Sequence, residues 1–545
     1  MSKTIETSVV IIGGSIVGLA TSAFLAYRKV PHILIEKHAG SAAHPRAIGF
    51  TTRTVELLRM LDADAQTQGT TFNRPPRRIQ VESLAGKWEE EKHWGKKPHG
   101  PPSGVKGGSD PNSGVLSPVT GVALSQDKME PIFRKRAVEL GAEHYLGWKM
   151  TSCSQTHSGV EVTAMSKTNE EIKVQAKYLI AADGSASPLR ESLNITRHGV
   201  GLMRSISSIL FRCEGIRKYL EKGFSQFEIK RDGFEAFLVS YPDGRWALMT
   251  YKQDDARLSD TEQKDLIRQV TGENLLDSDI EIVAHGGWDL AAFISDQYQS
   301  GRIFLVGDAA HTLPPTRGGY GANTGIADGH DLAWKIASVL SGESDPYLLD
   351  TYEPERRPLA LTRHNQVFAR PDYKEYLKTS EWKLPEGTEV IDDSAMEFGQ
   401  LYRSNAILGS EDLSLPEAQT PAEWAGQPGT RAAHFWIKQH EQRKSIMDLF
   451  YKHWVVLSQN RAWKDAEREA AEKCGITTSF VQIGADVVEE EEGNFERFYG
   501  VGKTGAVLVR PDGYIAWRCA EGPDNAGNVL AAALSKVAHA QRKKN

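Results

Sequence analysis

The chain has 545 residues, a formal net charge of −6 and 40% hydrophobic residues. This length exceeds what one ordinary hydrophobic core organises, so two or three domains are expected. The acidic balance, with no basic stripe in the sequence, excludes a general affinity for nucleic acid and favours a small-molecule partner.

The chain contains four scattered cysteines, Cys153, Cys213, Cys474 and Cys519. Their spacing fits neither a dithiol nor a zinc site, so we expect no structural disulfide, no metal and a reducing, cytoplasmic location. The uncharged stretch 9–27 has the length of a membrane span or signal peptide, but three glycines interrupt it. A buried strand, a glycine turn and a buried helix explain it better, and no membrane span is expected.

The first forty residues have the pattern of a dinucleotide-binding βαβ unit. A β-branched run at 7–12 leads into a glycine-rich turn, a helix pattern follows at 15–28, and an apolar run at 32–36 ends in Glu36. A helix that begins after glycines offers free N–H groups and close backbone approach to a pyrophosphate. The Glu36 carboxylate stands where it can accept both ribose hydroxyls of an adenosine. The residues expected to bind the cofactor here are Gly13, Ser15, Ile16, Val17, Gly18, Glu36 and Lys37.

Two details of this unit bear on which cofactor it can bind. Ser15 stands where the usual motif has its middle glycine, which is tolerable if the side chain points away from the pyrophosphate. A carboxylate at Glu36 would repel the 2′-phosphate of NADP. This unit alone therefore leaves NAD and FAD open.

Later segments alternate between helix and strand patterns. In chain order we expect a helix at 51–61, a surface loop at 96–114, a helix at 125–140, a β-meander at 145–182, a strand-rich region at 200–290 and a buried strand at 301–307. After residue 370 the chain becomes polar and loop-rich. A new α/β pattern begins near residue 426, with strands near 454–458 and 505–509, and indicates a separate C-terminal domain.

Four further segments stand out by their residue patterns. They are His44-Pro45-Arg46-Ala47 with the helix after it, Ser125-Gln126 at a helix start, Ala182-Asp183-Gly184, and Gly307-Asp308 with the glycine-rich run to Asn323. Asp308 follows a buried strand, where it can accept a hydrogen bond from a ribityl hydroxyl. The glycine-rich run feeds a helix whose N–H groups can face the flavin edge on which negative charge collects upon reduction.

These segments resemble the class A flavoprotein aromatic hydroxylases, the superfamily of p-hydroxybenzoate and phenol hydroxylases. The similarity covers most of residues 5–370 and is greatest to polyketide hydroxylases of the tetracenomycin and aklavinone type. It implies FAD contacts from Arg46, Gln126, Asp183, Gly184, Gly307, Asp308, Pro315, Gly318, Gly319, Gly321, Ala322 and Asn323.

The resemblance also implies the reaction. FAD would be the cofactor, with NAD(P)H and O₂ as cosubstrates, and a C4a-hydroperoxyflavin would hydroxylate a phenolic, aromatic or polyketide-type compound. Epoxidation or Baeyer–Villiger oxidation of a related polycyclic or quinone substrate, and a non-hydroxylating FAD-dependent oxidoreductase, stay open. So do two other classes, an NAD-linked dehydrogenase and a non-catalytic flavin-binding protein.

The implied fold is α/β, with a Rossmann-like FAD-binding domain interleaved with a β-sheet substrate domain and followed by a thioredoxin-like domain. The boundaries expected are 1–75, 112–200 and 290–370 for FAD binding, 76–111 and 201–289 for the substrate sheet, 371–425 for a linker and 426–545 for the last domain. The last domain has no CxxC motif, so its expected role is packing or homodimer formation rather than dithiol exchange.

No substrate base stands out. Five residues of the expected substrate sheet have suitable chemistry: Arg204, Tyr241, Tyr251, His285 and Trp288. None is favoured, because each type is more often a core or surface residue than a catalytic one. His311 is expected to have a structural role in its loop.

Overall fold

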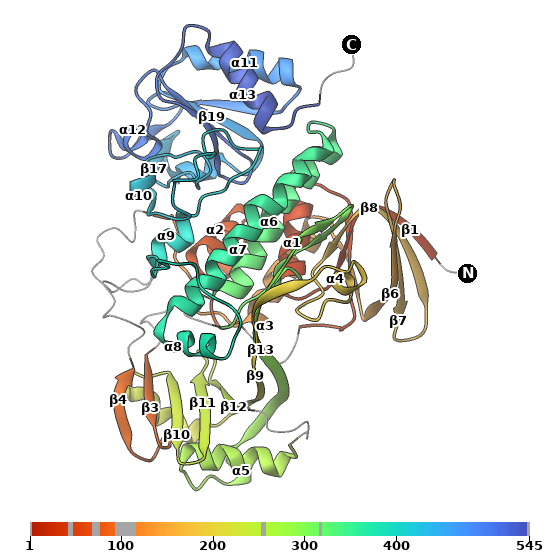
Figure 1. The fold of residues 1–545 in the computed structure, drawn as a ribbon, viewed down its shortest axis with the longest axis vertical. Coiled ribbons are helices and arrows are strands. Elements are labelled where there is room, and N and C mark those ends of the chain that lie inside the picture. The colour runs from red at the N-terminus through yellow and green to blue at the C-terminus, as the bar shows by residue number, and fades with distance from the viewer. Residues whose placement is uncertain are drawn as a thin grey trace.

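The computed structural model describes residues 3–41, 47–67, 77–92, 116–251, 258–315 and 319–541. These residues form two eight-stranded sheets and two smaller ones. Figure 1 shows three bodies stacked along the long axis: the C-terminal domain, a central α/β domain and a β-sheet domain at the opposite end. The expected α/β fold class is confirmed. No helix in the described ranges is long and apolar enough to cross a membrane.

The central sheet pairs strands that lie far apart in the sequence. β1 (Lys3–Ile12) lies between β2 (His32–Glu36) and β8 (Glu171–Ala181), and all three run parallel. β5 (Glu143–Leu146) and β15 (Ile303–Leu305) continue the parallel order at either side. Three more strands complete this sheet by antiparallel pairing: β6 (Trp148–Gln155), β7 (Val160–Ser166) and β14 (Gln299–Ser300).

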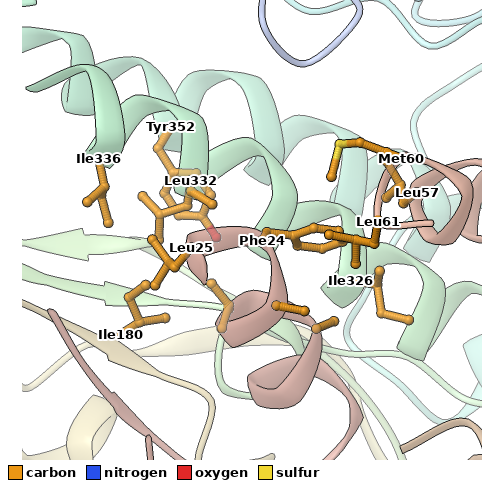
Figure 2. Close-up of a cluster of buried hydrophobic side chains, with 14 of the residues drawn as sticks. Phe24, Leu25, Leu57, Met60, Leu61, Ile180, Ile326, Leu332, Ile336 and Tyr352 are labelled. Atoms are coloured by element: carbon orange, nitrogen blue, oxygen red, sulfur yellow. The ribbon is translucent and has the colours of Figure 1, made fainter. Parts of the chain in front are cut away.

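Helices cover the central sheet and bury its apolar strands. They are α1 (Ile16–Tyr27), α2 (Thr52–Met60), α3 (Gln126–Glu139), α4 (Pro188–Ser192), α6 (Tyr320–Ser341) and α7 (Tyr352–Ala369). Figure 2 shows Phe24 and Leu25 of α1 packed among Ile180 of β8, Leu332 of α6 and Leu61 beyond α2. Each such side chain contributes about 1.5–3 kcal/mol on burial, so this layer fixes α1 against the sheet.

The second sheet is mostly antiparallel. In spatial order it runs β16 (His311–Thr312), β13 (Glu281–Ser295), β9 (Arg197–Arg212), β12 (Arg245–Tyr251), β11 (Phe234–Ser240), β10 (Gln226–Arg231), β3 (Arg78–Val81) and β4 (Trp88–Lys92). One face packs on α5 (Asp260–Thr271) through a core that includes Phe211, Trp246 and Ile267. The other face turns toward the central domain.

Residues 371–425, expected to be a linker, form short helices and loops that run from the side of the second sheet, near α8, to the C-terminal domain, near α10 (Figure 1). Their helices are α8 (Pro371–Lys374), the single-turn η6 (Glu375–Lys378), α9 (Asp393–Phe398) and α10 (Pro421–Trp424). Figure 1 shows α8 lying between the central domain and the second sheet.

The C-terminal domain is an α/β unit with a small central sheet. β20 (Thr478–Gln482), β19 (Trp454–Ser458), β22 (Ala506–Val509) and β23 (Ile515–Cys519) form that sheet, and α11 (Ala462–Cys474) and α13 (Ala526–Val537) pack together beside it. The remaining elements are β17 (Trp436–Gln439), β18 (Gln442–Ser445), β21 (Val488–Glu489) and α12 (Asn494–Tyr499). Trp334 of α6 inserts into this domain's core, with its ring 5.9 Å from that of Trp454.

A buried ionic cluster also joins the C-terminal domain to α6 and α7. Arg510 donates hydrogen bonds to Glu355 (2.6 and 2.8 Å) and Asp331 (3.3 Å) and pairs with Asp512. Lys335 donates to Asp331 and Glu355, both at 2.8 Å. Three carboxylates thus share two cations. Burial and the neighbouring carboxylates raise the pKa of Asp331 to about 7, against the attraction of Lys335 and Arg510.

Candidate functional site

The site begins at the carboxyl edge of the central sheet. Because β1, β2, β8 and β15 are parallel, the residues that follow them meet at one edge. Gly13, Glu36, Asp183 and Asp308 all line one cavity of about 1900 Å³ at that edge. Sequence order alone separates these residues widely, and the sheet brings them together.

The turn after β1 is built tightly around glycines. Gly13 has φ +105°, and a Cβ there would lie 2.2 Å from the carbonyl oxygen of Ala182. A Cβ on Gly18 would lie 1.9 Å from the carbonyl oxygen of Gly13. No larger residue fits either position without moving backbone, so α1 begins directly over the end of β1.

The Glu36 carboxylate is fixed by backbone donors. The N–H of Gly14 donates to Oε2 (2.6 Å) and the N–H of His38 donates to Oε1 (2.7 Å). The side chain therefore stands at the end of β2 in one orientation, beside the glycine turn. That orientation suits an acceptor for a ligand's hydroxyl groups.

Ser15 is held by side chains of α3. Its hydroxyl donates to Glu130 Oε1 (2.9 Å) and accepts from Gln126 Nε2 (2.9 Å). Gln126 also donates to Glu130 (2.9 Å). The serine in place of a glycine is thus accommodated by a polar contact to α3, and both Ser15 and Gln126 line the cavity.

The N-terminus of α6 forms another wall. Gly319, with φ +57°, precedes the helix, and Gly321 and Ala322 line the cavity in its first turn. Asn323 Oδ1 accepts from the N–H of Thr51 (3.1 Å) and the hydroxyl of Thr54 (2.6 Å), which ties α6 to α2. The positive end of a 22-residue helix dipole therefore faces the cavity.

Asp328 holds the turn after β15 in place. Its carboxylate accepts from the N–H of Gly307 (3.1 Å), from Arg356 (2.8 Å) and from His311 (2.7 Å). Burial alone would raise the pKa of Asp328, but His311 and Arg356 hold it at about 2. His311 is buried in this network and lies outside the cavity lining, so its expected structural role is confirmed.

Asp183 has an unused acceptor. Its Oδ2 accepts from the N–H of Leu189 (3.2 Å), and its Oδ1 is buried without a hydrogen-bond partner in the described part of the chain. Burial raises the pKa of Asp183. Asp183 and Gly184 both line the cavity, so this carboxylate has one oxygen left for a ligand donor.

The structure brings most of the predicted cofactor residues to the cavity wall. Those that line it are Gly13, Ser15, Ile16, Val17, Glu36, Lys37, Gln126, Asp183, Gly184, Asp308, Pro315, Gly319, Gly321, Ala322 and Asn323. Two predicted residues support the wall from behind: Gly18 packs on Gly13, and Gly307 lies against Val17. Arg46 and Gly318 fall outside the described residues.

The opposite wall is one face of the second sheet. Strand pairing sets Tyr251 opposite Ile206, Trp288 opposite Ile206, and Phe237 opposite Met249, so these side chains share a face. Of the five candidate residues on this sheet, three line the cavity: Arg204, Tyr251 and Trp288. Tyr241 is buried, and His285 contacts Ser207 (3.0 Å); neither residue lines the cavity.

Residues beyond position 370 also reach the cavity, which sequence reasoning missed. Asp372, Tyr373, Glu375 and Tyr376 of α8 and η6 line it. The hydroxyl of Tyr373 donates to the carbonyl oxygen of Pro315 (3.0 Å), and so connects this segment to the loop before α6. The polar, loop-rich composition hid this role; the only available signal was two tyrosines three residues apart, which share one side of a helical turn.

The fold and the cavity together define a flavoprotein of the FAD-binding type, in which a glycine turn and an acid occupy one end and a helix N-terminus the other. A family model described as an FAD binding domain matches residues 6–365, and one described as the C-terminal domain of aromatic-ring hydroxylases matches residues 425–540. The chain belongs to the FAD-dependent aromatic-ring hydroxylases.

Relatives and solved structures agree with this assignment. The chain is 34% identical to 4-methyl-5-nitrocatechol 5-monooxygenase of a Burkholderia species, with 98% of each chain covered. It is 32% identical to tetracenomycin A2 monooxygenase-dioxygenase of Streptomyces glaucescens, covering 98% of this chain and 97% of that one. A crystal structure of aklavinone-11 hydroxylase with FAD and aklavinone matches with a TM-score of 0.83 and 28% identity, covering 98% and 99%. The expected resemblance to polyketide hydroxylases is confirmed, and the chain is an FAD-dependent monooxygenase.

Proposed function

We propose that this enzyme uses NAD(P)H and O₂ to hydroxylate a phenolic or polycyclic aromatic compound in the cavity between its two large sheets. One observation carries the proposal: Glu36 and Asp308 line the same cavity, and that cavity continues along the second sheet. A volume of about 1900 Å³ exceeds the ~300–1,000 Å³ of a site for one small molecule, so cofactor and substrate fit together.

The residues present fit FAD. The glycine turn and α1 suit its pyrophosphate, Glu36 its adenosine ribose, and Asp308 its ribityl chain. The free Oδ1 of Asp183 offers one further acceptor. Bound FAD supplies the redox and oxygen-activating chemistry. The N-terminus of α6 stabilises negative charge on whatever group lies against it.

The second sheet holds and orients the substrate ring. Phe237, Val239 and Met249 form an apolar part of its cavity face, and Ile48 packs against them from the central domain. Such a patch accepts an aromatic ring and keeps water from the reacting atoms. Relatives named for a nitrocatechol, tetracenomycin A2 and aklavinone support substrates from one ring to several fused rings.

The test begins with the visible spectrum of the purified protein. We expect flavin absorbance, followed by NADH or NADPH oxidation that accelerates when catechols, naphthols or hydroxylated anthraquinones are added. Mass spectrometry under ¹⁸O₂ should show one labelled oxygen atom in the product. Comparing NADH with NADPH at equal concentration identifies the reductant.

Each alternative class gives a different result. A colourless protein that oxidises a substrate with NAD alone would be a dehydrogenase. A yellow protein whose oxidation of NADH or NADPH is not accelerated by any aromatic compound would be a non-catalytic flavin-binding protein. An ester or epoxide product in place of a phenol would identify the Baeyer–Villiger or epoxidising variant.

A further inference from the structure

Arg204 stands on the cavity face of the second sheet with its guanidinium stacked on aromatic rings. The guanidinium carbon lies 4.0 Å from the ring centre of Tyr251, on β12, and 5.7 Å from that of Tyr376, in η6. All three residues line the cavity. Two rings from different segments thus hold a long, flexible side chain in one orientation.

The hydrogen-bonding capacity of Arg204 is almost unused. An arginine has five N–H donors in a planar fork. Within the described residues Arg204 makes no side-chain hydrogen bond, and its one ion pair is a loose contact with Glu235 at 3.8 Å. Glu235 is in turn shared with Lys230 at 3.4 Å. Arg204 and Lys230 therefore share the single carboxylate of Glu235, which leaves positive charge on Arg204 without a close partner of its own.

Other charged residues on this face have partners of their own. Arg78 pairs with Glu228 at 2.9 Å, and Asp289 accepts from the hydroxyl of Ser205 at 2.8 Å. Asp372 also lines the cavity, and its burial raises its pKa. Arg204 is thus a positively charged side chain on this cavity face whose guanidinium is held by aromatic rings and whose N–H donors are available to a ligand.

We propose that Arg204 binds the substrate through a pair of coplanar oxygens that share negative charge, such as a carboxylate, a nitro group or adjacent phenolate and carbonyl oxygens. This inference rests on the proposed function and names its substrate class: an aromatic ring with a pair of negatively charged or negatively polarised oxygens on its edge. The planar fork matches such a pair with two parallel N–H···O bonds. Tyr251 and Tyr376 position the fork before the substrate arrives, which lowers the entropy cost of binding.

The test compares ligands of equal shape and different charge on the FAD-loaded protein. Isothermal titration calorimetry measures 3,4-dihydroxybenzoate against 3,4-dihydroxybenzamide, and anthraquinone-2-carboxylate against its carboxamide. We expect the wild type to bind at least one acid about 10- to 100-fold more tightly than its amide, which is the range for charge-assisted hydrogen bonds. A third pair, 4-nitrocatechol against 4-methylcatechol, shows whether a nitro group serves in place of a carboxylate.

The variants isolate the guanidinium. Arg204→Gln should remove the preference for the acid and leave binding of the amide within about twofold, and Arg204→Lys should keep only part of it because lysine lacks the fork. Arg231→Gln is the matched control, since Arg231 also stacks on a ring of this sheet (Phe234, 4.8 Å) but does not line the cavity. It should leave both affinities unchanged.

The outcomes separate this inference from the function on which it rests. A protein without bound FAD contradicts the proposed function. An FAD-loaded wild type that prefers neither acid over its amide overturns recognition by Arg204. Recognition by Arg204 is equally overturned if Arg204→Gln weakens acid and amide to the same extent, because a residue that only supports the fold would act on both.

Discussion

The two halves of the cavity are built by different means. The cofactor half, in which we propose that FAD binds, consists of turns at the ends of parallel strands, where glycines and backbone groups at Gly13, Gly184 and Gly319 form the wall. The substrate half, in which we propose that the aromatic compound binds, consists of side chains from the face of an antiparallel sheet, together with α8 and η6. A backbone wall tolerates almost no change of residue, whereas a wall of side chains can change its chemistry without changing the fold. Substitutions in the cofactor half should therefore be poorly tolerated, and substitutions in the substrate half should be tolerated better.

The strongest test of this contrast is a substitution that adds one methyl group to the wall of the cofactor half. Gly13→Ala forces a Cβ to within 2.2 Å of the Ala182 carbonyl oxygen at a φ of +105°. We expect FAD binding about 100-fold weaker, measured by the ratio of flavin to protein absorbance during titration with FAD.

Gly40→Ala is the control, because a Cβ there meets no atom within 4 Å. On the substrate side, Met249→Leu should leave FAD affinity unchanged, since the volume is conserved. A Gly13→Ala protein that retains wild-type affinity for FAD would contradict the idea of a rigid backbone wall.

A second test concerns the joint between α2 and the C-terminal domain, which side chains form. Arg431 pairs with Glu56, which also accepts from Arg53 (2.9 Å), and all of Glu56 is buried. Arg431→Met leaves Glu56 with one cation, and we expect the free energy of unfolding to fall by about 3–5 kcal/mol. Urea unfolding measures it.

The control for this joint is Arg443→Met. Arg443 pairs with Glu490 at 2.7 Å on the surface, with about half of its side chain exposed. Arg443→Met should lower the free energy of unfolding by less than about 1 kcal/mol. Equal losses for the two variants would show that burial does not govern the joint.

The ionic cluster at the same interface should make stability depend on pH. Asp331 has a folded pKa of about 7, above the ordinary value near 3.9, so between these values the folded protein keeps a proton that the unfolded chain has lost. The free energy of unfolding therefore falls as pH rises from about 4 to 7. Relative to Asp331→Asn, which cannot ionise, the wild type should lose about 1–3 kcal/mol between pH 5 and pH 8.

Thermal unfolding of the wild type and of Asp331→Asn at several pH values measures this difference in stability. Asp465→Asn, which removes an exposed partner of Arg468, serves as the control and should shift the curve equally at every pH. A wild-type curve that runs parallel to that of Asp331→Asn would mean that the cluster holds no proton at neutral pH.

The smallest expected effect lies where the two halves meet. Tyr373→Phe removes the hydroxyl that donates to Pro315 in the loop before α6. We expect a loss of about 1 kcal/mol, seen as a several-fold rise in KM for the aromatic substrate with little change in FAD affinity. Tyr376→Phe keeps the ring beside Arg204 and should change neither value; a Tyr373→Phe enzyme with unchanged KM would show that this contact does not shape the substrate half.

Patterns of local sequence predicted the secondary structure of the cofactor half. The strand, glycine turn and helix at the N-terminus, and the placement of Glu36 and Asp308 after buried strands, follow from rules that act over a few residues. The role of His311 was also predictable, because a histidine in such a loop is most often hydrogen-bonded. The hydrogen-bond network of Asp328 was not, since its partners come from the stretch 307–311 and from α7, both distant in sequence from Asp328 on α6.

The substrate half was predicted only as a region. Strand alternation shows which residues share a face, but not which face meets the cavity, because pairing register and the covering helix decide that. Arg204 and Tyr251 could not be preferred over Tyr241 and His285 for this reason. The contribution of Tyr373 and Tyr376 depends on where a loop-rich segment docks, and no local pattern encodes it.

The sequence by itself determined the α/β class, the dinucleotide turn and the separate C-terminal domain, because each depends on short-range periodicity and on conformations that glycine alone adopts readily. Only the tertiary structure decided which side chains of the second sheet line the cavity and how Arg204 lies beside the rings of Tyr251 and Tyr376. Those contacts join residues from separate strands and from a segment far along the chain, and their geometry follows from packing between these elements rather than from any one of them.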